Sequence, residues 1–289
     1  MRTIALRFML SIGMLSPGLQ ESDGVDPKVQ NLVEEIAAAR DPETVARGYT
    51  TLFKNPDRKL LAQLKGVKET GVALRAAWED ALLTGANKQE FTRERRLEDG
   101  EPSRPKPEAA QRFLGFAEGR LGVQLPPWWE ETVRSHHRDA RLLNLEEPKN
   151  KVSQRGSLEK QGRQALLCVG NERVLLAPAI ARKYGWAQRV AISANQKTCL
   201  IAFHSTVGSS YPLVCVDRET GDLVWEAKVW DQALEGDVKG VWFENVSLVE
   251  QGERVFAFGA GPYWFYVEAF NRKTGRNEFR FANFYAAEG

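Results

Sequence analysis

Two turn sequences of the same design, 54 residues apart, constrain the fold of this chain more than any other feature. Asp217-Arg-Glu-Thr-Gly221 and Asn271-Arg-Lys-Thr-Gly275 each stand between runs of apolar, β-branched and aromatic residues. An Asp or Asn side chain at the start of such a turn accepts hydrogen bonds from backbone N–H groups ahead of it. A glycine at the end supplies the positive φ that a hairpin with a bulge requires. Each turn therefore predicts a β-hairpin.

Around each turn the sequence predicts four antiparallel strands. The runs of the first set begin near Val190, Cys199, Leu213 and Leu223, and those of the second near Val246, Val255, Tyr266 and Phe279. Four positions after each turn glycine stands an aromatic residue, Trp225 in the first set and Phe279 in the second. Equal placement predicts an equal role, which is to pack one sheet against the next. Repeated four-stranded units are the pattern of β-propeller blades.

The motif Asp217-x-x-Thr-Gly221-x-x-x-Trp225 resembles the repeat of the quinoprotein-type (PQQ-like) β-propellers, and Asn271 to Phe279 is a looser second copy. Together with the stretch 113–129, it makes the chain similar to uncharacterised exported bacterial proteins that carry such repeats. Enzymes of the quinoprotein family hold pyrroloquinoline quinone and a calcium ion at the centre of a closed ring. Propellers have about four to eight blades, so two units cannot close a ring. The resemblance therefore implies a shape, and no cofactor residue can be assigned from it.

No catalytic or metal-binding constellation is recognisable in the sequence. His204 and Ser205 are adjacent, but a nucleophilic serine also needs an orienting acid and an oxyanion pocket. The glycine-rich segment 259–262 precedes an expected strand, whereas phosphate-binding loops precede a helix. We therefore predict no catalytic residue, no cofactor and no metal, and we expect a protein that is not an enzyme. An envelope enzyme with redox or hydrolytic chemistry is the alternative.

Four consecutive aromatic residues, Tyr263 to Tyr266, are the best candidate for a binding surface. Neighbouring residues on a strand face opposite sides, so four in a row cannot all enter one core. One interpretation is packing between two sheets or against a helical domain. The other is a surface for a protein or glycan partner, formed by Tyr263, Trp264 and Tyr266 together with Trp242.

The region before the strands is predicted to be helical. Three pairs combine a helix-capping side chain with a proline suited to the first turn: Asp26-Pro27, Asp41-Pro42 and Asn55-Pro56. Apolar residues recur at helical spacing from near Thr70 and from near Glu108. The pattern predicts an α-helical domain over 26–143, interrupted by a charged, proline-rich mobile loop at 87–107.

The predicted fold class is α+β, with the helical domain followed by an all-β domain. A polar linker is expected at 144–163, and the β domain, with its two blade-like units, over 164–289. Pro126-Pro127 is expected to end the last helix, ahead of Trp128-Trp129, which should cover the end of the helical core. Cys199 and Cys215 fall on consecutive strands and could be joined if they share a face, but we expect free buried thiols.

Charge and the N-terminus bear on location. Forty basic and thirty-eight acidic side chains leave no concentrated basic face, so nucleic-acid binding is not expected. Arg2, an apolar run from Phe8 and small residues at Ser16 and Gly18 predict a signal peptide over 1–20. The run is shorter than the roughly 20 residues that a membrane span needs, so no stable span is expected. We expect an exported protein, periplasmic or extracellular.

Taken together, these features predict a non-catalytic binding or assembly module of the bacterial cell envelope. Its ligand cannot be named from the sequence, and the partner is an unknown protein or glycan. Strand edges at the ends of the predicted sheets also allow self-association.

Overall fold

A computed structural model of the protein describes residues 25–39, 42–54, 56–85, 105–135, 157–162, 164–184, 190–194, 197–203, 211–229, 245–261 and 264–283. The expected signal peptide at 1–20, residues 87–104 of the expected loop and residues 144–156 of the expected linker lie outside these ranges. Among the described helices, none combines the length and the apolar character that crossing a bilayer requires.

The described N-terminal part is helical, as predicted. Its helices are α1 (Pro27–Ala38), α2 (Pro42–Phe53), α3 (Arg58–Lys65), α4 (Thr70–Gly85), α6 (Pro107–Leu121) and α7 (Pro127–Ser135). The Asp26 carboxylate caps α1 by accepting a hydrogen bond from the Lys28 N–H at 2.8 Å. Helix α3 starts later than Asn55-Pro56 predicts, because Asp57 is its cap and accepts from the Leu60 N–H at 2.7 Å.

The prolines near residue 126 act differently from the prediction. Helix α6 already ends at Leu121, where Gly122 adopts a left-handed conformation with φ 68°. Pro127 is then the first residue of α7, which carries both Trp128 and Trp129. Proline suits that position because its missing N–H needs no partner there. The two tryptophans therefore lie in a helix of their own.

The rest of the described chain forms antiparallel sheets. Their strands are β1 (Ser157–Gln161), β2 (Gln164–Val169), β3 (Glu172–Leu176), β4 (Val190–Ala194), β5 (Thr198–Phe203), β6 (Tyr211–Asp217), β7 (Leu223–Val229), β8 (Asn245–Gln251), β9 (Arg254–Gly261), β10 (Trp264–Asn271) and β11 (Asn277–Asn283). A short helix, α8 (Pro178–Tyr184), follows β3. Residues 157–161, within the expected linker, form strand β1, so the β region begins earlier than 164.

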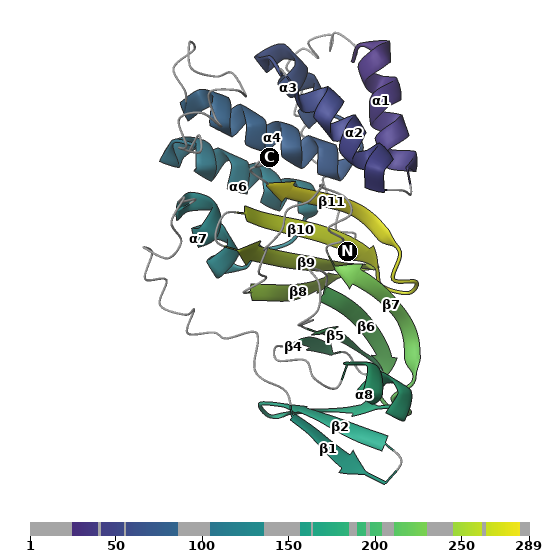
Figure 1. The fold of residues 1–289 in the computed structure, drawn as a ribbon. Coiled ribbons are helices and arrows are strands. Elements are labelled where there is room, and N and C mark those ends of the chain that lie inside the picture. The colour runs from purple at the N-terminus through teal and green to yellow at the C-terminus, as the bar shows by residue number, and fades with distance from the viewer. Residues whose placement is uncertain are drawn as a thin grey trace, which may run out of the picture.

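Three sheets result from these strands. The N-terminal sheet has the order β1-β2-β3, the first repeat sheet β4-β5-β6-β7 and the second repeat sheet β11-β10-β9-β8. Each repeat sheet is a meander in which every strand pairs with its neighbour in the sequence. The described strands form a stack of open sheets and do not close a ring (Figure 1).

The two repeat sheets share their register in detail. Cys215 pairs with Trp225 in the first, and Ala269 pairs with Phe279 in the second. A bulge follows directly in both, so that the next pairs are Val216 with Leu223 and Phe270 with Asn277. The sequence offset of 54 residues therefore corresponds to a structural equivalence, and the turn with its glycine sets the same bulge twice.

The layers are stacked in the order N-terminal sheet, first repeat sheet, second repeat sheet and helices (Figure 1). One apolar cluster joins the N-terminal sheet to the first repeat sheet, and includes Leu167, Val174, Ile201 and Val214. A second cluster joins the two repeat sheets. A further cluster lies wholly among the helices, with Val33, Leu61, Leu64 and Val72.

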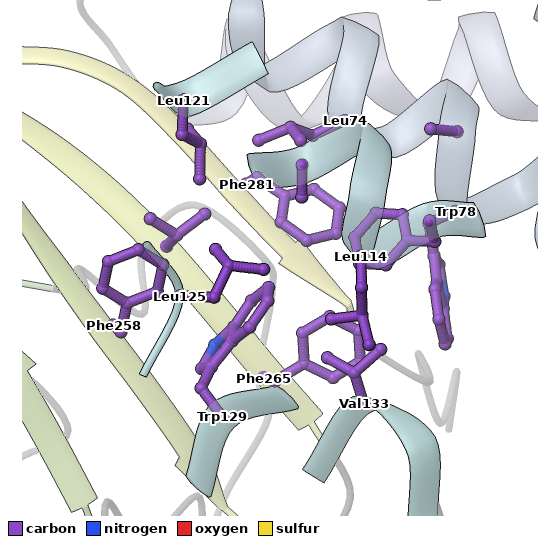
Figure 2. Packing of buried hydrophobic residues seen from close by; sticks show 14 of the residues in the cluster. Leu74, Trp78, Leu114, Leu121, Leu125, Trp129, Val133, Phe258, Phe265 and Phe281 are labelled. Carbon is purple, nitrogen blue, oxygen red and sulfur yellow. The ribbon is translucent and has the colours of Figure 1, made fainter. Parts of the chain in front are cut away.

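Most of the buried aromatic side chains lie in one cluster, the helix–sheet core, which α4, α6, α7 and strands β9–β11 share (Figure 2). It includes Leu74, Trp78, Phe113, Trp129, Phe258, Phe265 and Phe281. The Phe265 ring lies 5.0 Å from the Trp78 ring and 5.2 Å from the Trp129 ring between centroids. Helices and second repeat sheet are therefore one packed unit.

Trp128 and Trp129 fasten α7 to that sheet. The indole N–H of Trp128 donates to the Ser247 hydroxyl at 2.9 Å, and that of Trp129 donates to the Tyr266 carbonyl at 2.9 Å. We expected the two tryptophans to cover the end of a helical core. The structure shows that both also bind to strands of the second repeat sheet. Their hydrogen bonds satisfy polar groups that the apolar contact would otherwise bury unpaired.

Candidate functional site

The repeated turns have the geometry that their sequences predict. The Asp217 carboxylate accepts from the backbone N–H groups of Glu219 and Thr220, both at 2.9 Å. The Asn271 side-chain oxygen accepts from Lys273 and Thr274, both at 3.1 Å. Because the bonds favour the charged form, the two backbone donors hold the pKa of Asp217 below its ordinary value.

Both turn glycines have positive φ and both lie against the preceding layer. Gly221 has φ 76° and Gly275 has φ 68°. A Cβ atom added at Gly275 would lie 2.4 Å from the Trp225 ring, and one added at Gly221 would lie 2.9 Å from the backbone nitrogen of Ala177. Glycine is needed at these positions for the backbone conformation and also for the close approach of a neighbouring sheet.

Trp225 is the joint between the two repeat sheets. Its side chain is only 7% exposed and belongs to the cluster between them. Its indole N–H donates to the carbonyl of Arg272, in the turn of the second repeat sheet, at 2.9 Å. Its ring also covers Gly275 of that turn. The aromatic residue of one unit therefore docks on the turn of the next.

Phe279, the equivalent residue, does not meet another sheet. It too is 7% exposed, but it belongs to the helix–sheet core and lies beside Phe256, with ring centroids 6.3 Å apart. The helices α4, α6 and α7 occupy the side of the second repeat sheet on which a further sheet would be stacked. A phenylalanine suits this place because it has no N–H group that needs an acceptor.

The aromatic run at 263–266 is only partly described. Phe265 and Tyr266 both have 0% exposure, on opposite faces of β10. Phe265 enters the helix–sheet core, and Tyr266 enters the cluster between the repeat sheets. Tyr266 therefore lies in the interior and offers no partner surface. Trp264 belongs to β10, paired with Gly261, but its side chain is outside the described part, as are Tyr263 and Trp242.

Tyr266 has a specific neighbour in the interior. It is paired across the strands with Gly259, and a Cβ atom at that glycine would lie 2.0 Å from the Tyr266 ring. The ring therefore occupies the space above Gly259, which explains a glycine in the middle of strand β9. The glycine-rich segment 259–262 thus has a packing role in its described part.

Glu268 is a buried charge that the sequence analysis did not single out. It has 0% exposure on β10, and its Oε2 atom accepts from the Asn277 side chain at 2.9 Å and from the Arg280 Nε at 3.0 Å. A buried carboxylate is tolerated where a cation and hydrogen bonds compensate for lost hydration. The signal in the sequence was a single acidic residue inside the apolar strand from Tyr266 to Phe270.

A shallow depression of about 420 Å³ lies beside the end of α6. Its lining consists of Leu121, Gln251, Glu253, Arg254, Phe256 and Glu278. Its charged groups are already paired: Arg254 contacts Glu278 at 2.7 Å, and Lys273 contacts Glu253 at 2.5 Å. With Leu121 only 6% exposed and Phe256 only 1% exposed, the depression presents little apolar surface to a ligand.

The cysteines are free and buried, as expected. Cys199 belongs to the cluster on the N-terminal-sheet side of the first repeat sheet, and Cys215 to the cluster on the opposite side. Side chains on opposite faces cannot be bridged, so a disulfide between them is excluded. Burial raises the pKa of Cys199 to about 12 and also raises that of Cys215, which keeps both in the unreactive thiol form.

Within the described ranges, no three or more His, Cys, Asp or Glu side chains gather closely enough to hold a metal ion. His204 and Ser205 lie outside those ranges. The described residues singled out above instead form contacts that hold the sheets and the helices together. A scan against protein-family models and a search of curated proteins both found no match to the chain.

Proposed function

We propose that the protein is a non-catalytic assembly module of the bacterial cell envelope, built from propeller-blade-like units. The observation that carries the proposal is the joint at Trp225, whose indole bonds to the Arg272 carbonyl and whose ring covers Gly275. A four-stranded unit that docks on the turn of the next unit is a device for stacking sheets. The PQQ-like resemblance of the repeat fits this use of its aromatic position.

The two ends of the stack of layers differ. At one end, helices cover the second repeat sheet through the helix–sheet core. At the other end stands the N-terminal sheet, which has one strand fewer than either repeat sheet. A stack that is closed by helices at one end favours a terminal unit of an assembly over a ring-forming enzyme domain.

The envelope location rests on the N-terminal sequence. Arg2, the apolar run from Phe8 and the small residues Ser16 and Gly18 have the order of a secretory signal. Free buried thiols at Cys199 and Cys215 are compatible with an oxidising compartment, because their separation across the sheet prevents bond formation.

The test uses the tagged full-length protein expressed in a bacterial host. We expect recovery from the envelope fraction, a mature N-terminus between about Gly18 and Asp23, and a particle mass above that of one chain by light scattering. Recovery from the cytoplasm with Met1 intact would contradict export. A monomer that carries no partner, in every fraction, would contradict assembly, and a substrate turned over by that monomer would favour the enzyme alternative.

A further inference from the structure

We draw no further inference here: the strongest candidate, the outer edge of the first repeat sheet at strand β7 with the exposed apolar side chains of Leu223 and Val224, carries none because nothing in the structure shows what covers it.

Discussion

The two repeat sheets have the same turns, the same bulge and the same register, yet they are completed by different neighbours. The first lies between two sheets, and its Trp225 bonds to the next turn. The second lies between a sheet and a helical layer, and its Phe279 belongs to the apolar core shared with that layer. The turn chemistry is therefore local and repeats, whereas the aromatic position is adapted to the layer that covers it.

The strongest test of this comparison removes the helices. A segment of residues 157–289 would expose Phe258, Phe265 and Phe281, which the helix–sheet core buries. Losing one such core aromatic costs about 3–5 kcal/mol, and a domain has about 5–15 kcal/mol in total. We expect no cooperative transition in denaturant, measured by tryptophan fluorescence, while the full chain unfolds in one step. A sigmoidal transition of the segment at the full-length midpoint would show that the sheets are independent of the helices.

The next prediction separates the two aromatic positions. Trp225→Ala and Phe279→Ala should each lower the free energy of unfolding by about 3–5 kcal/mol, because both side chains fill a core. Trp225→Phe retains an aromatic ring, though a smaller one, and leaves the Arg272 carbonyl without its donor; the loss of that hydrogen bond alone costs about 1–2 kcal/mol.

Phe279→Tyr is the matched change in the second repeat sheet, since it adds a polar group where the helices offer apolar surface. Chemical denaturation of the full-length variants gives all four values. Equal stability of Trp225→Phe and wild type would mean that the indole hydrogen bond plays no part in the joint.

The next prediction compares alanine substitutions at two glycines with positive φ, one at a turn that contacts Trp225 and one at a turn with free space around it. Alanine at a left-handed position costs about 1–2 kcal/mol for the backbone alone. Gly252 has φ 59° with nothing within 4 Å of an added Cβ, so Gly252→Ala should show only that cost. Gly275→Ala should lose about 1–3 kcal/mol more, because its Cβ would meet the Trp225 ring. Equal unfolding midpoints for the two variants would argue against close docking of Trp225 on the turn.

A pH titration distinguishes the two turns. The pKa of Asp217 is lowered in the folded protein, so its contribution to stability is present above the ordinary value of 3.8 and is lost as the pH falls through the folded value. Asn271 does not titrate. Asp217→Asn should therefore flatten the decline in thermal midpoint below about pH 5, whereas Asn271→Asp should steepen it. Parallel curves for wild type and Asp217→Asn would contradict this assignment.

The smallest effects are expected at the turn tips. Arg218 lies 3.7 Å from Glu172, and Lys273 forms an ion pair in which both side chains are more than two-thirds exposed, at 75% and 71%. Exposed pairs of this kind contribute little, so Arg218→Ala and Lys273→Ala should each change the unfolding free energy by less than about 0.5 kcal/mol. A larger loss for Arg218 would indicate that its tip takes part in holding the N-terminal sheet.

Local signals in the sequence predicted local structure well. The Asp217 and Asn271 turns, the positive φ of Gly221 and Gly275, and the cap at Asp26 all follow from side chains that bond to nearby backbone. Each of these interactions involves a few residues that are close together in the sequence, so the sequence alone is enough to predict them. The α+β class follows from the same periodicities.

Contacts between segments that are far apart in the sequence could not be predicted from it. Trp128 and Trp129 could be assigned to a core but not to Ser247 and the Tyr266 carbonyl, because nothing near them in sequence specifies an acceptor more than a hundred residues away. Strand β1 was missed since its residues, Ser157 to Gln161, are mostly polar and resemble linker. Tyr266 was open to two interpretations until the glycine opposite it was known to leave room for its ring.

The helix–sheet core also sets the order of events during synthesis. Trp78 and Phe113 are made early, and their partners Phe265 and Phe281 are near the end of the chain. The ribosome must therefore release almost the whole polypeptide before α4 and α6 can bury the faces that meet the second repeat sheet. Contacts of such long sequence separation slow folding, which leaves a nascent chain open for a long interval. Under the export that we propose, that delay is an advantage, because a chain that has not yet folded can still pass through a translocation channel.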